Sequence, residues 1–465
     1  MAEASYSPRL RTALVLCGAG TAGAYHAGVL RALAEAGVRI DLVAAHGAGV
    51  APALFAAIDG SARLWDPAGP WSEPRLRGAY RWRPALRAAG YGLAAALALL
   101  LAPLIVLVLA AVVYALSQAA ALANLPSMAE RLVAWYSDAL QLLFSPPVLP
   151  TVVPRLVVLA LLVVAGVIVW TGVRTWRQER SRRRIRGAFW WRLLGTPLAG
   201  DEPAGTMVDA LWRLIRGASG EPRPRHADIS RRYVDILADN FGQPGFRDLL
   251  LAVHDVDARR DLVGAVLAPQ AREGFEARRE GRSLREAEIV DFTGPQRALL
   301  IDFLIAAERL PVAMPPHLLP FPIESYWRGE LHRACDRPEL LTRLIDELAG
   351  IGVEQVIVAS PAAPPAVPHA MRPRPGDLRA RVGEIVRSIE TAVLEDACAS
   401  AAVRFSGVYA VRPGHNPIGP FDLGGAYDEA SDRRRTVAEL IQQGYDDAYR
   451  QFIEPVVAAG DRIEV

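Results

Sequence analysis

Residues 13–49 read ALVLCGAGTAGAYHAGVLRALAEAGVRIDLVAAHGAG, and this stretch decides the fold class. The apolar run at 12–16 predicts a buried strand, and the glycines that follow predict a sharp turn. Apolar residues at helical spacing predict a helix over 24–35, which ends near Gly37. A second strand is expected over 40–45, followed by a glycine turn and an apolar helix over 50–58. This order predicts an α/β fold with a largely parallel sheet.

The first turn also matches the dinucleotide fingerprint GxGxxG, from Gly18 to Gly23. That fingerprint requires an acidic residue at the far end of the second strand, where it holds a ribose hydroxyl. Here the nearby acid, Asp41, begins the strand, and the strand ends in Ala-Ala-His. A nucleotide-binding protein is therefore a weaker alternative, and we expect no cofactor.

The same stretch more closely resembles the patatin-like phospholipase family. The family's landmarks are a glycine-rich oxyanion turn, a His-x-Gly-Val-Leu helix and a Gly-x-Ser-x-Gly nucleophile elbow. The corresponding residues are CGAGTAG at 17–23, HAGVL at 26–30 and AHGAG at 45–49. The resemblance implies a three-layer domain and a nucleophile at position 47, but Gly47 has no hydroxyl to attack an ester. Backbone amides for an oxyanion hole are implied at Gly18, Ala19, Gly20 and Thr21.

The family resemblance returns over about 60 residues in the second half of the chain. A proline-rich segment at 311–322 precedes Tyr-Trp-Arg-Gly-Glu at 326–330, where the family carries Tyr-Trp-Asp-Gly-Gly. This alignment puts Arg328 in the place of the catalytic aspartate. We interpret Arg328 either as a binder of phosphate or carboxylate or as a partner of Glu330 or Asp336. Loss of both catalytic side chains favours a protein that does not hydrolyse esters.

Three other side chains near the turns are candidates for a relocated nucleophile or base: His46, His26 and Cys17. A packed or solvent-facing side chain is the favoured interpretation of each, because no partner stands at a defined spacing. The three cysteines are scattered and predict neither a disulfide framework nor a zinc site. The run His254-Asp255-Val256-Asp257 is interpreted as a solvated helix end, so we expect no metal site.

Two long uncharged stretches predict membrane insertion. Hydrophobic residues make up 52% of the 465-residue chain. Helices over about 91–118 and 154–173 are long enough to form a two-helix transmembrane hairpin. Arginines flank the hairpin on both outer sides, which predicts cytoplasmic termini and a cytoplasmic patatin-like domain. The membrane is expected to be a bacterial inner membrane. The net charge of +2 implies no nucleic-acid partner.

These patterns divide the chain into four segments. Residues 1–74 and 291–465 are expected to form the two halves of the patatin-like domain. The hairpin with its basic flanks occupies 75–187, and a helical insertion is expected over 188–290. The hypothesis is a membrane-anchored, catalytically inactive patatin-like protein that binds phospholipid, a lipid ligand or a membrane protein. The alternative is an active phospholipase or esterase that uses a relocated nucleophile.

Overall fold

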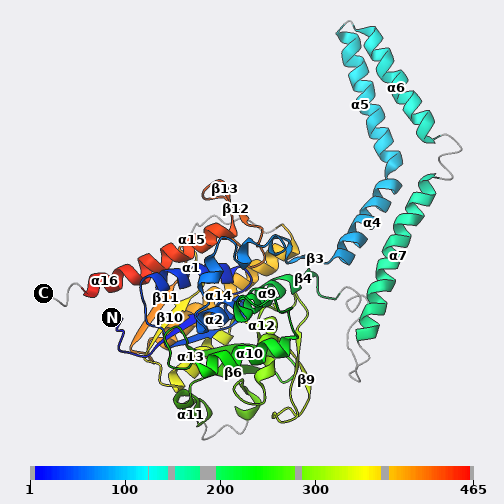
Figure 1. The fold of residues 1–465 in the computed structure, drawn as a ribbon. Helices are drawn as coiled ribbons and strands as arrows, with labels where there is room; N and C mark the ends of the chain where they lie inside the picture. Colours follow the sequence, from blue (N-terminus) through cyan, green and yellow to red (C-terminus); the bar gives the residue numbers. More distant parts are fainter. Residues whose placement is uncertain are drawn as a thin grey trace. The chain divides into compact units, whose positions relative to one another are not determined.

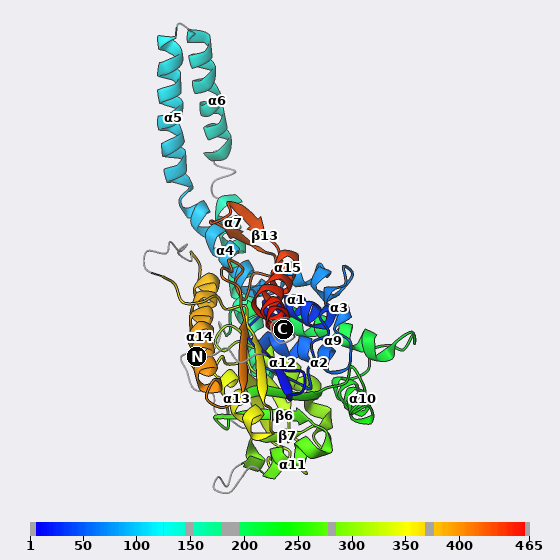
Figure 2. The same cartoon turned by 90° about the vertical axis from the view of Figure 1, so that its left-hand side faces the viewer.

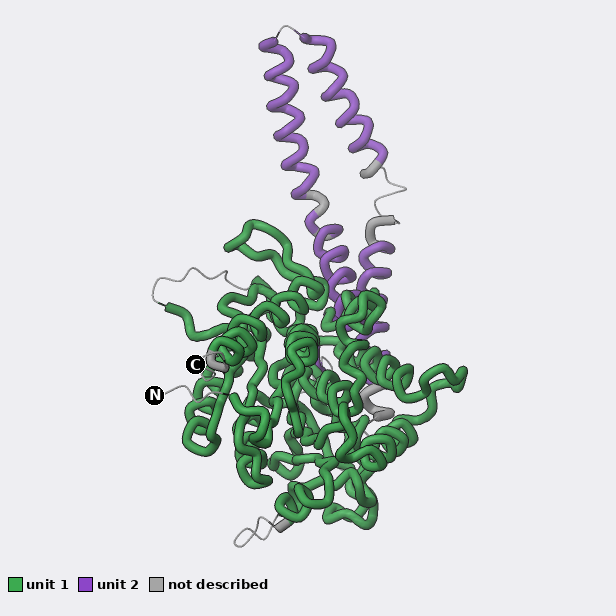
Figure 3. The backbone as a smooth tube through the Cα atoms, turned by 60° about the vertical axis from the view of Figure 1, so that its left-hand side comes forward, with its two compact units in different colours: residues 1–81, 198–465 green, residues 82–197 purple. Residues whose placement is uncertain are grey.

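The computed structural model describes residues 6–123, 125–144, 152–178, 195–277, 285–367 and 376–460. The chain divides into two compact units, one of residues 1–81 and 198–465 and one of residues 82–197 (Figure 3). The longer unit, unit 1, contains both ends of the chain. The shorter one, unit 2, is a single excursion from it. Where the chain leaves and returns to unit 1, the Tyr80 N–H donates to the Ala199 carbonyl at 2.9 Å.

Unit 1 is built on a nine-stranded sheet whose main path runs β11-β10-β1-β2-β5-β6-β7 (Figure 1). The first five strands of this path are parallel to one another, β6 is antiparallel to β5, and β7 is parallel to β6. The strands are β1 Thr12–Leu16, β2 Leu42–Ala45, β5 Asp248–Asp255, β6 Arg260–Val266, β7 Ile289–Asp291, β8 His317–Pro320, β9 Leu331–Cys335, β10 Gln355–Ala359 and β11 Gly407–Val411. Every residue of β1, β2 and β10 is buried, as expected of interior parallel strands.

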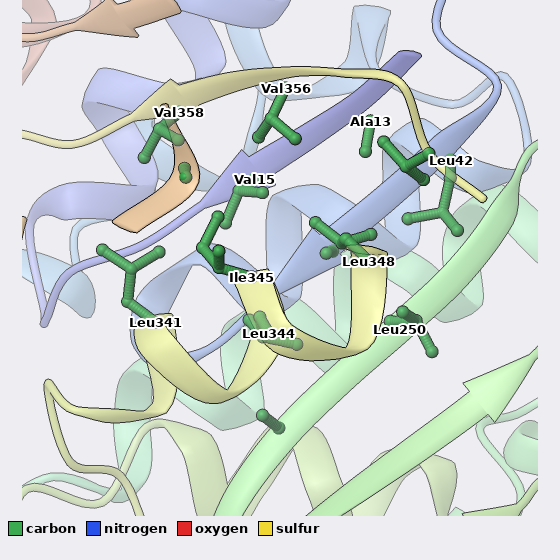
Figure 4. Packing of buried hydrophobic residues seen from close by; sticks show 14 of the residues in the cluster. Ala13, Val15, Leu42, Leu250, Leu341, Leu344, Ile345, Leu348, Val356 and Val358 are labelled. Atoms are coloured by element: carbon green, nitrogen blue, oxygen red, sulfur yellow. The ribbon is translucent and has the colours of Figure 1, made fainter. Parts of the chain in front are cut away.

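Helices cover both faces of this sheet, so unit 1 has three layers (Figure 2). The main helices are α1 Ala22–Glu35, α2 Val50–Ala57, α9 Asp201–Arg216, α10 His226–Asp239, α12 Leu300–Ala307, α13 Leu340–Gly350, α14 Leu378–Ala401 and α15 Val437–Ala448. α13 and α14 pack on one face, and Leu344 and Leu348 of α13 pack in the core with Val15 of β1 and Val356 of β10 (Figure 4). Leu394 of α14 belongs to the same core. On the other face, α1 packs against α15 and α2. The predicted α/β fold with a parallel-rich sheet is confirmed.

The predicted helical insertion over 188–290 is wrong in part. Residues 198–290 belong to unit 1 and supply β5, β6 and most of β7, in addition to α9 and α10. The run Leu249–Val253 is buried on both sides of its strand. Such a run is apolar at every position, so periodicity cannot distinguish an interior strand from a buried helix. The part of the predicted basic flank over 179–194 lies outside the described residues.

The described residues of unit 2 form four long helices: α4 Pro84–Leu100, α5 Ala102–Leu122, α6 Pro126–Phe144 and α7 Val152–Gln178. α4 packs against α7, and α5 packs against α6. The Tyr136 hydroxyl on α6 donates to the Val106 carbonyl on α5 at 2.6 Å. The close approach of Gly92 on α4 to Val164 on α7 leaves no room for a β-carbon.

The predicted two-helix transmembrane hairpin is not supported. Within the described residues, one stretch, Leu104–Leu122, is long and apolar enough to span a membrane, and 11% of it is buried. The helix expected over 91–118 is divided at Leu101, where Pro103 in the first turn of α5 has no N–H to donate. The apolar stretches of α4 and α7, Pro84–Leu99 and Arg155–Trp170, are shorter.

Candidate functional site

The predicted elbow forms a strand, a tight turn and a helix. His46 is extended after β2, with φ −138° and ψ 170°, and Gly47 then takes a left-handed φ of +58°. A short 3-10 turn over Gly47–Gly49 leads directly into α2. At Gly49 a β-carbon would lie 2.2 Å from the Leu16 carbonyl oxygen. The two glycines therefore allow the turn to pass against the end of β1.

The space beside Gly47 is filled by the chain itself. A β-carbon at position 47 would lie 2.5 Å from the Gly18 carbonyl oxygen and 2.8 Å from Asp336 Oδ2. The Gly18 carbonyl also accepts a hydrogen bond from the Ala48 N–H at 2.8 Å. A side chain at position 47 would require movement of backbone atoms, because nonbonded contacts to a β-carbon are not this short.

The carboxylate beside the elbow belongs to Asp336, whereas the sequence alignment put Arg328 there. Asp336 directly follows β9, is 1% exposed and bonds through Oδ1 to His46 Nδ1 at 3.0 Å. Arg328 lies on an exposed turn, and its N–H donates to the Ser325 carbonyl. The structure shows no bond from Arg328 to either suggested partner in its described part. Glu330 bonds instead to His332, and Asp336 bonds to His46.

One feature of the sequence could have identified Asp336 as a site residue: it directly follows a strand. Residues 331–335 alternate in exposure, with Leu331 and Arg333 exposed and His332 and Ala334 buried. This short strand was not predicted, and the Tyr-Trp-x-Gly pattern drew the alignment to Arg328. Asp336 and His46 together form a buried carboxylate–imidazole pair next to a residue that has no side chain.

Two of the four candidate oxyanion amides are already occupied. The Ala19 N–H donates to Glu390 Oε1 at 2.8 Å, and the Thr21 N–H donates to the Pro420 carbonyl at 3.1 Å. A β-carbon on Gly20, whose φ is +56°, would lie 1.8 Å from the Pro420 carbonyl oxygen. Residues 419–420 thus pack on the turn that matched the dinucleotide fingerprint.

Two glutamates near Asp336 have raised pKa values. Burial raises the pKa of Glu390 to about 8, and the charge of Asp336 adds to the effect. Burial likewise raises the pKa of Glu308 to about 7, again with a contribution from Asp336. The Tyr80 hydroxyl donates to Glu308 at 3.3 Å. Glu390 and Glu308 therefore favour their protonated forms more than exposed glutamates do.

His26 and Cys17 have the environment of packed side chains. His26 Nε2 contacts the carbonyl oxygens of Cys17 and Ala359 at 3.1 and 3.2 Å, and burial lowers the pKa of His26 to about 3. The Cys17 thiol donates to the Ala359 carbonyl at 3.4 Å, and burial raises its pKa, which disfavours the thiolate. Neither environment activates a nucleophile.

The prediction that the His-Asp-Val-Asp run at 254–257 is a helix end is wrong, because the run lies at the end of a strand. His254 and Asp255 are the last two residues of strand β5. His254 Nδ1 bonds to Asp261 at 2.9 Å, and Asp255 bonds to His332 Nδ1 at 2.5 Å. Asp257 instead pairs with Arg333. In the described part of the chain, no group of three or more potential ligands is placed to hold a metal ion.

Comparison with known proteins gives little further support. No protein-family model matches the chain, and no curated protein matches it. The crystal structure of VipD from Legionella pneumophila is similar at a TM-score of 0.28 and 10% sequence identity, over 96% of this chain and 67% of that chain. This weak structural similarity carries no argument about the site. The class that the fold and site define is a three-layer α/β protein with a glycine elbow.

Proposed function

We propose that this chain is a membrane-associated patatin-like protein that binds a lipid or a membrane protein partner without hydrolysing acyl esters. The proposal rests on the elbow, where other atoms of the chain occupy the space beside Gly47. Serine-type hydrolysis needs a nucleophile at the elbow and free amide donors for the oxyanion. Here position 47 is glycine, the Gly18 carbonyl and Asp336 lie against it, and Glu390 holds the Ala19 amide.

Membrane association is proposed through α5. Nineteen residues at about 1.5 Å per residue give a helix of about 28 Å, which matches the hydrocarbon thickness of a bilayer. Core helices of soluble proteins are mostly buried, whereas this stretch is 11% buried. Cytoplasmic termini and a bacterial inner membrane stay predictions, the first of which rests on the distribution of arginines.

The test is ester turnover and covalent labelling of the full chain in detergent micelles. A p-nitrophenyl ester reports turnover, and a fluorophosphonate probe followed by intact-mass spectrometry reports a reactive nucleophile. We expect no labelling and no turnover above that of the Asp336→Asn variant. Turnover that disappears in Asp336→Asn would contradict the proposal. The alternative of a relocated nucleophile predicts labelling that is lost in Cys17→Ala or His46→Ala.

Restoring the serine gives a sharper version of this test. Because Asp336 already lies at the elbow, Gly47→Ser needs no accompanying change at Arg328. We expect Gly47→Ser to remain unlabelled, because the Ala19 amide is still held by Glu390. A folded Gly47→Ser variant that reacts with the probe would show that the site is still open to substrate.

A further inference from the structure

Unit 1 has an open cavity of about 780 Å³ over the β12–β13 hairpin and α15. The hairpin, Ala426–Asp428 and Arg433–Arg435, lies beside α15 in Figure 1. None of the lining residues belongs to the elbow, and the volume lies within the usual range for small-molecule sites. The lining residues are Gly414, His415, Arg433, Arg435, Glu439, Gln442, Gln443, Asp446, Asp447, Arg450 and Gln451.

A buried carboxylate orients two of the side chains at this cavity, those of His415 and Arg435. Asp428 is 1% exposed and accepts hydrogen bonds from His415 Nε2 at 2.9 Å and from Arg435 Nε at 3.1 Å. The Ser431 hydroxyl donates to the same carboxylate at 2.7 Å. Within the described residues, no partner is present for the terminal guanidinium nitrogens of Arg435 or for Nδ1 of His415. The terminal guanidinium donors of Arg435 are therefore held in place and remain available to a ligand.

Two further arginines at the cavity are exposed, and their partners differ: Glu439 is partly exposed, whereas Asp447 is buried. Arg433 pairs with Glu439 at 2.7 Å, and Arg450 pairs with Asp447 at 3.2 Å. The two arginine side chains are 56% and 66% exposed. Exposed ion pairs contribute little to stability, so an incoming anion can recruit the Arg433 guanidinium at small cost. Arg450 is held more firmly, because it pairs with the buried Asp447 and also donates to the Asp446 carbonyl.

The acidic side chains of the lining limit what kind of anion fits. Asp446, on the exposed side of α15, accepts a hydrogen bond from the Gln442 amide at 2.9 Å and has no cationic side-chain partner within the described residues. The three lining arginines are matched by three lining carboxylates, so a bare anion would meet charges of both signs. A ligand that carries both an anion and an ammonium group satisfies both sets.

We propose that this cavity binds a zwitterionic phosphate ester, with its phosphate on Arg435 and Arg433 and its ammonium group on Asp446. Phosphate fits better than a carboxylate, because its additional oxygens can accept hydrogen bonds from several guanidinium groups at once. The ligand is either a free small molecule or the headgroup of a phospholipid, because both present the same chemistry.

The test is titration of the full chain in phosphate-free maltoside micelles with O-phosphoethanolamine, followed by 31P NMR. We expect saturable binding that Arg435→Gln weakens about 10-fold or more, because a charge-assisted hydrogen bond is lost. The matched control is Arg297→Gln, which removes an exposed arginine paired with Asp235 and should bind as the unmodified chain does. Asp446→Asn should weaken binding of O-phosphoethanolamine and leave binding of inorganic phosphate unchanged.

Three results would overturn the proposal: no binding of O-phosphoethanolamine, equal binding by Arg435→Gln and the control, or inorganic phosphate binding as tightly as the ester. Thermal melting of each variant shows whether it is folded. If Arg435→Gln does not fold, Asp446→Asn still tests the proposal, because Asp446 is exposed and lies on α15. Competition by a monomeric short-chain phosphatidylethanolamine would assign the site to a lipid headgroup. Binding of the free ester without such competition would assign it to a soluble ligand.

Discussion

The two glycine turns of unit 1 and helix α5 of unit 2 are both uncharged stretches, yet their environments are opposite. Residues 17–23 and 46–49 are buried, and their backbone groups are held by Glu390, Pro420 and Gly18. α5 has little burial. An irregular turn needs partners from elsewhere in the chain, whereas a helix satisfies its own backbone and can face lipid. Lack of charge therefore does not by itself predict whether protein or membrane covers a segment.

The largest effect is expected when the packing of the glycine turn is disturbed. Gly20→Ala places a β-carbon 1.8 Å from the Pro420 carbonyl oxygen at a left-handed backbone position. We expect the free energy of unfolding to fall by about 3 kcal/mol or more, measured by chemical or thermal denaturation. The control is Gly37→Ala, where φ is +64° and no atom lies within 4 Å of the added carbon. It should cost about 1–2 kcal/mol, and equal losses in both variants would mean that the turn is not closely packed.

The next effect tests the opposite environment, that of α5. Val112→Arg puts a charge near the middle of the apolar stretch, where insertion into a bilayer costs about 2.5–3.5 kcal/mol. We expect less protein in the membrane fraction after flotation and little change in the thermal stability of unit 1. Val312→Arg is the matched control, because Val312 is 80% exposed on unit 1. If Val112→Arg floats with membranes as the unmodified chain does, α5 is not the membrane segment.

A third, smaller effect concerns how the free energy of unfolding depends on pH, through Glu390, which holds the Ala19 amide of the first glycine turn. The folded-state pKa values of Glu390 and Glu308, about 8 and 7, lie above those of the unfolded chain. The folded protein therefore binds more protons between pH 5 and 8, and the free energy of unfolding should fall as pH rises through this window. Glu390→Gln should flatten that decline when denaturation is measured at several pH values. An equally steep decline in the variant would show that Glu390 does not titrate in this range.

Local sequence signals predicted β1, α1, β2 and α2 well. Each is a continuous apolar run or an apolar helical pattern bounded by glycine, and such patterns depend on near neighbours in the sequence. The predicted strand at 12–16 matches the structure at both ends. The elbow was also predicted, because its glycines occur where a strand gives way to a helix.

The chemical surroundings of the elbow could not be predicted in the same way. Asp336 is 290 residues from His46, and Glu390 is 371 residues from Ala19. Contacts of this separation depend on how the sheet brings strand ends together, which no local pattern encodes. Hydropathy likewise identified the apolar part of α5 but gave no indication that the amphipathic helix α6 packs against it.

Hydrogen exchange at the Ala19 amide tests the closed elbow most directly. The account predicts slow exchange of this amide in the unmodified chain, because its N–H is bonded to Glu390. Glu390→Ala should speed exchange about 10- to 100-fold at Ala19, while the Thr21 amide, bonded to the Pro420 carbonyl, should be unchanged. Exchange at Ala19 in the unmodified chain as fast as that of an exposed amide would contradict the account.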